Sequence, residues 1–187
     1  METQKLNQED GYETVSLVPL HRTHDVESFS SGRETLDTFL KKHALAAPSQ
    51  GLSQTWVAIS GSGQVVGYYT LSMSTIEVSA ATTRVAKGMP RYPIPVVLLA
   101  RLAVDKSVQG QGLGRLLLLA AMQKAVQLGR VPLAADGGPG LPMRAMLVHA
   151  IDEQAAQFYE HFGLSRSPTD QLHLMILLKE IEETLRT

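Results

Sequence analysis

A glycine-rich turn in the middle of the chain joins an apolar run to a run of helix-forming residues. Residues 96–104 are mostly apolar and β-branched at their start, which predicts a buried strand. Residues 116–122 are leucine and alanine with one methionine and predict a helix. Glycines occupy positions 110, 112 and 114 between them. Because the first turn of a helix carries unpaired N–H groups and the positive end of its dipole, this turn predicts an anion-binding site.

The spacing of the glycines excludes two common phosphate-binding motifs. A Walker loop continues with Gly-Lys-Ser/Thr, whereas Gly114 is followed by Arg115 and Leu116. A Rossmann turn reads G-x-G-x-x-G, and this turn reads G-x-G-x-G. Tight packing of a strand against a helix would also favour glycine here, so spacing alone leaves a purely structural role open.

The composition favours one soluble globular domain. The 187 residues are 44% hydrophobic, and 17 basic side chains nearly balance 18 acidic ones, which does not favour non-specific nucleic-acid binding. Cysteine is absent, and the six histidines are too scattered to predict a metal site. No apolar run is long enough to span a membrane, and the polar residues 1–10 lack the apolar core of a signal peptide, so a cytoplasmic protein is expected.

The order of the predicted elements indicates a single mixed α/β sheet. We expect a flexible polar N-terminus over residues 1–11 and one domain over 12–187. Asp25 or Ser31 is expected to cap the first helix, Asp152 to cap the helix over 153–161, and Gly163 to end it. Strands are expected at 12–20, 55–59, 64–71, 96–104, 144–150 and 172–178, and helices at 26–47, 116–129, 153–161 and 179–186. The inward positions expected in the first helical region are Phe29, Leu36, Phe39, Leu40 and Leu45.

The glycine turn also carries the signature of a known family. Gln109-Gly-Gln-Gly-Leu-Gly114 fits the pattern Q/R-x-x-G-x-G/A, and a predicted strand over residues 102–104 precedes it. In this respect the chain resembles the GNAT family of N-acetyltransferases. The resemblance implies an α/β (α+β) fold whose mostly antiparallel sheet has about six to seven strands, flanked by helices and splayed between strands 4 and 5. It also implies that main-chain amides of the turn bind the pyrophosphate of acetyl-CoA.

Three further stretches resemble a narrower group. They are residues 29–40, 66–72 and 155–164, and together with residues 101–105 they look like the TacT-type acetyltransferase toxins of toxin–antitoxin pairs. The resemblance extends over residues 17–178. It implies an enzyme that acetylates the α-amine of aminoacyl-tRNA and so blocks translation. It further implies a homodimer and a ribbon-helix-helix antitoxin, through which alone the toxin would meet DNA.

The resemblance also implies roles for individual residues. Tyr159 would be the general acid that protonates the coenzyme A sulfur, although an amphipathic helix would bury the same side chain for packing alone. Asp152 departs from the pattern, because relatives have asparagine seven residues before the tyrosine. The implied cofactor-binding residues are Leu102, Ala103, Val104, Gln109, Gly110, Gln111, Gly112, Leu113, Gly114, Arg115, Asp152, Ala155 and Phe158.

The central strand indicates which amine is the acceptor. Residues 96–104 contain no carboxylate, so this strand offers no general base. A lysine amine, with a pKa of about 10.4, needs such a base near neutral pH, whereas an α-amine near 8 needs much less help. This favours an α-amine over a lysine side chain.

Two basic clusters are the best candidates for contacts with tRNA phosphates, although charge clusters are also typical of ordinary solvated surfaces. Their members are Arg84, Lys87 and Arg91 in one and Arg33, Lys41 and Lys42 in the other. Two other functions stay open: an acetyltransferase for small amines or protein N-termini, and a catalytically weak partner of a ribbon-helix-helix regulator. The apolar residues 94–96 are expected to be exposed and to suit a dimer interface.

Overall fold

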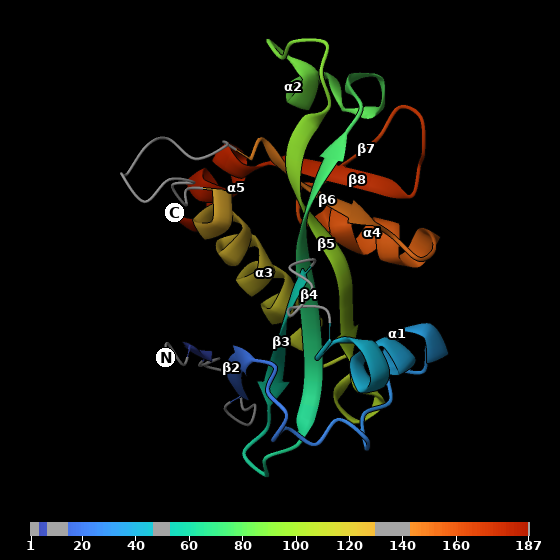
Figure 1. The fold of residues 1–187 in the computed structure, drawn as a ribbon, viewed down its shortest axis with the longest axis vertical. Helices are drawn as coiled ribbons and strands as arrows, with labels where there is room; N and C mark the ends of the chain where they lie inside the picture. Colours follow the sequence, from blue (N-terminus) through green and yellow to red (C-terminus); the bar gives the residue numbers. More distant parts are fainter. Residues whose placement is uncertain (1–3, 7–14, 47–52, 130–142, 187) are drawn as a thin grey trace. The chain divides into compact units, whose positions relative to one another are not determined.

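The computed structural model describes residues 4–6, 15–46, 53–129 and 143–186 (Figure 1). These residues form two compact units. Unit 1 holds the described residues up to Ser72 together with Arg101–Ala121, and unit 2 holds Met73–Ala100 together with the described residues from Met122 onward. Strands β4 (Val65–Ile76) and β5 (Ile94–Val104) and helix α3 (Leu113–Gly129) each contribute residues to both units.

Unit 1 is built on an antiparallel sheet. Its strands pair in the order β1 (Gln4–Leu6), β2 (Val15–Pro19), β3 (Ser53–Ile59) and the first part of β4. The strands expected at 55–59 and 64–71 are confirmed as an antiparallel hairpin, and its turn over residues 60–63 is closed by the Ser60 N–H, which donates to the Gln64 carbonyl at 2.9 Å. Strand β1 lies within the segment that was expected to be a flexible terminus. At three residues it is too short to leave an alternating pattern in the sequence.

The first predicted helix is much shorter than expected. Helix begins only at α1 (Glu34–Thr38) and continues as the π-helix η1 (Phe39–His43), so the prediction for 26–33 is wrong. Neither expected cap is correct: the Asp25 carboxylate accepts the Glu27 N–H, and the Ser31 hydroxyl accepts the Arg33 N–H. Such local hydrogen bonds offer the backbone an alternative to helix. Of the expected inward positions, Phe29 and Leu40 are fully buried, whereas Leu45 is exposed.

The fully buried Tyr68 ties the helical segment to the sheet of unit 1. Its hydroxyl donates to the Leu36 carbonyl at 2.8 Å, and its ring packs edge-on against Phe29 and stacks on Phe39. Burial raises the pKa of Tyr68, so the phenol stays protonated and keeps donating. The Arg101 guanidinium lies over the Phe39 ring, 4.0 Å from its centroid.

A single glycine sets how closely α3 approaches the sheet in unit 1. A Cβ added at Gly67 would lie 2.8 Å from Leu117 Cδ1 and 3.2 Å from the Ala103 carbonyl oxygen. A side chain at Gly67 of β4 would therefore crowd Leu117 of α3 and the Ala103 carbonyl of β5, so glycine suits this close approach. This contact fixes the end of β5, which leads into the glycine turn.

Unit 2 contains a parallel strand pair. Strand β5 pairs with β6 (Ala145–His149) in parallel, and β6, β8 (His173–Leu177) and β7 (Ser165–Arg166) follow in antiparallel order. The remaining elements of unit 2 are η3 (Val78–Ala80), α2 (Thr83–Ala86), α4 (Glu153–His161) and α5 (Leu178–Leu185). The mixed, mostly antiparallel α/β sheet is confirmed. The described residues form eight strands because β1 and the two-residue β7 add to the six expected from the sequence.

Strand β5 pairs with β6 over only part of its length. Its pairs with β6 run from Val96 to Leu99, although β5 itself continues to Val104, as expected for a sheet that splays between these two strands. The expected exposed apolar surface at residues 94–96 is wrong, because Ile94 and Val96 are fully buried in the core of unit 2. The sequence also predicts a loop over residues 131–142, which contains Gly137-Gly138-Pro139-Gly140, and this segment lies outside the described residues.

Candidate active site

The glycine turn of unit 1 has the predicted strand–turn–helix form. Strand β5 ends at Val104, η4 (Lys106–Val108) follows as one 3₁₀ turn, and α3 begins at Leu113. Gly110 and Gly112 have φ angles of +75° and +86°, in the left-handed region that side chains rarely adopt. A Cβ at Gly110 would meet nothing within 4 Å, so glycine is required there by the backbone conformation and not by crowding.

Two polar side chains brace this turn against the loop around residue 30. The Asp105 carboxylate accepts the Ser30 N–H at 2.7 Å and the Ser107 N–H at 2.9 Å. Partial burial works against the charge, but these hydrogen bonds and the neighbouring Lys106 lower the pKa of Asp105, which therefore stays ionised. The Gln109 side-chain amide donates to the Ser31 and Val104 carbonyls, both at 2.9 Å.

The Gln109 side chain holds the turn to the protein's own backbone. Its place among the cofactor-binding residues stays a prediction. The neighbouring Gln111 side chain likewise donates to the Ser107 carbonyl, at 3.4 Å. What the turn can offer an anion is thus its main chain. Arg115 is exposed on the first turn of α3.

Strand alternation distinguishes among the three residues at the end of β5. The Asp105 N–H donates to the Val66 carbonyl of β4, so Ala103, two residues earlier, has its main-chain groups on the same edge. The main-chain groups of Leu102 and Val104 point to the opposite edge, consistent with the hydrogen bond that the Val104 carbonyl accepts from Gln109. Leu102 and Val104 are therefore better placed than Ala103 to pair with an extended ligand.

Helix α4 of unit 2 begins and ends as predicted. The Asp152 carboxylate accepts the Ala155 N–H at 2.9 Å, which makes Asp152 the N-cap residue, and Gly163 ends the helix with a φ of +86°. A carboxylate serves as a helix cap as well as an amide does. Ala155 and Phe158 are half-buried on the same helix.

Tyr159 of α4 is buried, and its hydroxyl makes no hydrogen bond within the described residues. Its side chain is 8% exposed and its ring meets Phe158 edge-on, with centroids 5.3 Å apart. Among the residues that the structure describes, its hydroxyl has no hydrogen-bond partner, which is unusual for a buried polar group. Burial raises the pKa of Tyr159 to about 12. The phenol is therefore protonated at neutral pH and available to donate to a ligand.

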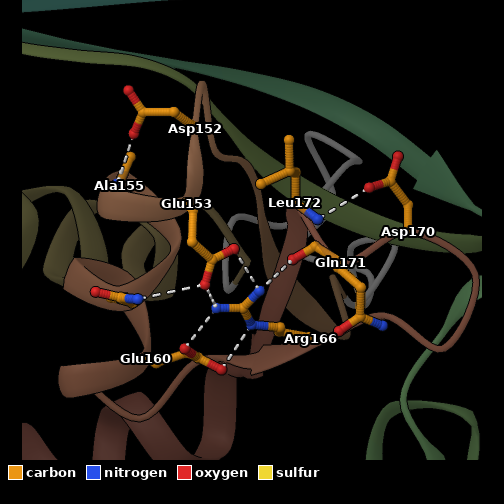
Figure 2. Close-up of polar contacts among 9 residues, drawn as sticks. Asp152, Glu153, Ala155, Glu160, Arg166, Asp170, Gln171 and Leu172 are labelled. Carbon is orange, nitrogen blue, oxygen red and sulfur yellow. Dashed lines mark hydrogen bonds and ion pairs between the residues drawn. The ribbon is translucent and has the colours of Figure 1, made fainter.

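An arginine that the sequence reasoning missed holds this helix. Figure 2 shows Arg166 of β7 between Glu153 and Glu160, which project from the first and last turns of α4. The shortest contacts are 2.6 Å to Glu153 and 2.8 Å to Glu160, and the hydrogen bonds from Arg166 lower the pKa of both carboxylates. The seven-residue spacing of the two glutamates was the available signal, because it places them on one helix face.

The basic residues predicted to contact tRNA differ in their surroundings. Arg84 is engaged, with an ion pair to Glu180 at 2.7 Å and a hydrogen bond to the Ser165 hydroxyl at 3.2 Å. Lys87 and Arg91 are exposed, and Tyr92 beside them is 73% exposed. The second cluster lies in unit 1, where Arg33 and Lys42 are exposed and Lys41 is half-buried.

Two negative findings concern the described residues only. They contain no group of three or more histidines or carboxylates that could hold a metal ion. The helices in these parts of the chain are too short or too polar to cross a lipid bilayer.

Comparison with known proteins places the chain in a family. The family model for the acetyltransferase (GNAT) domain matches residues 51–164, and the chain belongs to the GNAT family of acetyltransferases. Among curated proteins, it is 47% identical over 156 residues to the tRNA-acetylating toxin of Mycobacterium tuberculosis, covering 83% of this chain and 87% of the toxin.

Solved structures similar to this one include toxins of the same group. A KacT mutant is 28% identical with a TM-score of 0.80, over 91% of this chain and 98% of that one. AtaT complexed with acetyl-methionyl-tRNAfMet is 29% identical with a TM-score of 0.77, over 91% and 99%. AtaTR bound with acetyl-CoA is 29% identical with a TM-score of 0.74, over 91% and 98%.

Proposed function

We propose that this chain is an acetyl-CoA-dependent N-acetyltransferase that acetylates the α-amine of aminoacyl-tRNA and blocks translation as the toxin of a toxin–antitoxin pair. The observation that carries this proposal is the extensive similarity to the M. tuberculosis tRNA-acetylating toxin. AtaT, with acetyl-methionyl-tRNA, and AtaTR, with acetyl-CoA, support the two substrates. We include in the proposal a single domain over residues 12–187, a cytoplasmic location, a homodimer and a ribbon-helix-helix antitoxin.

Unit 1 supplies the cofactor-binding residues in this proposal. The main-chain amides from Gly110 to Arg115 hold the pyrophosphate of acetyl-CoA, because a turn that ends in a helix N-terminus presents several unpaired donors to an anion. Leu102 and Val104 pair with the pantetheine arm in the manner of an added strand. The braces from Asp105 and Gln109 keep this backbone in place before the ligand arrives.

Unit 2 supplies the proton in this proposal. The acceptor amine attacks the thioester carbonyl carbon, the new C–N bond forms, and the C–S bond breaks to leave a thiolate that must gain a proton while the nitrogen loses one. Tyr159 donates the proton to the thiolate sulfur as a general acid, since its phenol is neutral and has no other partner within the described residues. The proton that the nitrogen loses passes to water, and the phenolate regains a proton from solvent. Asp152 caps this helix, and Ala155 and Phe158 lie on it before Tyr159.

The pH dependence of the reaction should show a rising limb and no falling limb. Below its pKa of about 8 the acceptor α-amine is protonated and cannot attack, so kcat/KM should increase as the pH rises to about 8 and then level off. The Tyr159 pKa of about 12 means that the acid stays protonated up to pH 10. Initial rates measured from pH 6 to 10 check this, and a loss of rate with a midpoint near pH 9 would contradict the assignment of Tyr159.

Two exposed basic residues should contribute to tRNA binding and not to acetyl-CoA binding. Replacing Lys87 and Arg91 with glutamate should raise KM for charged tRNA about fivefold at low salt and leave acetyl-CoA binding unchanged, because each contributes one phosphate contact. Arg84 is omitted, since its reversal would break the ion pair with Glu180. Arg22→Glu, at an exposed arginine that forms no ion pair within the described residues, is the control. Equal effects on tRNA and acetyl-CoA would exclude the cluster from tRNA binding.

One assay tests the proposed function against its alternatives. Purified protein is incubated with labelled acetyl-CoA and pooled charged tRNA, and label is sought on the amino acid. Label on the aminoacyl α-amine supports the proposal. Label only on small amines or protein N-termini supports the first alternative, and no transfer to any acceptor supports the catalytically weak regulator.

A further inference from the structure

Arg166 contacts α4 at two points on one face of the helix. Glu153 and Glu160 are seven residues apart, about two helical turns, and so project in nearly the same direction. Arg166 Nη1 and Nη2 donate to the two Glu153 oxygens at 2.9 and 2.6 Å, and its Nε and Nη2 donate to the two Glu160 oxygens at 2.8 and 2.9 Å (Figure 2).

The arginine is itself firmly anchored. Its side chain is 19% exposed, less than the 59% and 40% of its two partners, and Nη1 also donates to the Gln171 carbonyl at 3.4 Å. Its backbone lies on β7, where Arg166 pairs with Leu174 of β8. A planar guanidinium that binds two carboxylates in bidentate fashion constrains direction as well as distance. The pair of contacts therefore fixes the rotation of α4 about its own axis relative to β7.

That rotation decides where the Tyr159 hydroxyl lies. Tyr159 precedes Glu160 by one residue and so projects about 100° around the helix from the clamped glutamate. The side chains of a helix reach about 5–6 Å from its axis, so a rotation of about 10° moves their outer atoms by roughly 1 Å. Because the hydroxyl has no hydrogen-bond partner among the described residues, its position follows that of the buried ring and of the helix that carries it.

We propose that Arg166 is a positioning residue that acts on acetyl transfer through Tyr159, an inference that rests on the function proposed above. Catalytic groups need to be held within about 0.5 Å of their productive position, and a shift of about 1 Å can cost roughly 100-fold in rate. Arg166 does not itself touch the reacting atoms. It holds the Tyr159 hydroxyl in one position relative to β7.

The test compares Arg166→Lys with a matched change elsewhere in unit 2. Lysine keeps the positive charge but cannot bind both carboxylates in bidentate fashion. We expect Arg166→Lys to lower kcat at least tenfold while KM for acetyl-CoA stays within about twofold, with both measured well below the melting temperature. Arg186→Lys makes the same change at the Arg186–Glu182 pair of α5 and should alter neither. Glu160→Gln, which weakens one of the two contacts, replaces Arg166→Lys if that variant does not fold.

A double-mutant cycle separates positioning from a merely structural role. If Arg166 acts through Tyr159, then Arg166→Lys should lower kcat in the wild type and have no further effect in a Tyr159→Phe background. An equal loss in both backgrounds would overturn the proposal, as would a normal kcat for Arg166→Lys when Tyr159→Phe is slow. Normal turnover of Tyr159→Phe itself would instead remove the acid assigned under the proposed function.

Discussion

Replacing Tyr159 with phenylalanine should give a folded protein that binds acetyl-CoA normally and turns over about 10²- to 10⁴-fold more slowly. The substitution removes one oxygen atom and leaves the packing of the ring against Phe158 intact. Since the hydroxyl has no hydrogen-bond partner within the described residues, its loss should not destabilise the fold. A large kinetic effect with no change in stability is what a general acid predicts and a packing residue does not.

The measurement pairs single-turnover acetyl transfer with the affinity for acetyl-CoA and the melting temperature. Tyr69→Phe is the matched control, because Tyr69 is also buried, stacks on Trp56 and has no hydroxyl partner in the described part of the chain. Tyr69→Phe should leave the rate of acetyl transfer, the affinity for acetyl-CoA and the melting temperature unchanged. Unchanged turnover in Tyr159→Phe would mean that burial alone explains this tyrosine.

The features that the sequence predicted correctly are those set by neighbouring residues. The hairpin at 60–63, the Asp152 cap and the helix end at Gly163 each depend on residues within a few positions of one another. The glycine turn belongs to the same class, because two left-handed residues between a strand and a helix require glycine whatever surrounds them.

The features that the sequence did not reveal depend on contacts between distant residues. Residues near Ser30 stay non-helical because the Ser30 N–H binds Asp105, 75 positions away, and the Ser31 carbonyl accepts Gln109, 78 positions away. The sequence predicts an exposed interface at Ile94 and Val96, but residues distant in the chain cover them in the core of unit 2. No neighbouring residue marks Arg166 in the sequence, because its ion pairs to Glu153 and Glu160 form only in the folded chain (Figure 2).

Replacing Gly110 with alanine should weaken acetyl-CoA binding roughly 10- to 100-fold. The φ of +75° at Gly110 is strained for alanine, and the expected cost in stability is about 1–2 kcal/mol. If the turn relaxes to relieve this strain, its N–H groups rotate away from the pyrophosphate. A hydrogen bond to a charged group contributes about 1.5–3 kcal/mol, which gives the expected loss in affinity. Calorimetric titration with acetyl-CoA measures it directly.

Gly63→Ala separates backbone strain from ligand binding. Gly63 lies in the β3–β4 turn of the same unit, has a φ of +86°, and like Gly110 would place a Cβ with nothing within 4 Å. Alanine should therefore cost about as much stability at either position, about 1–2 kcal/mol, and only Gly110→Ala should lose affinity. If both variants bind acetyl-CoA as the wild type does, the turn at Gly110 is needed for the fold alone, and the pyrophosphate must be held by other groups.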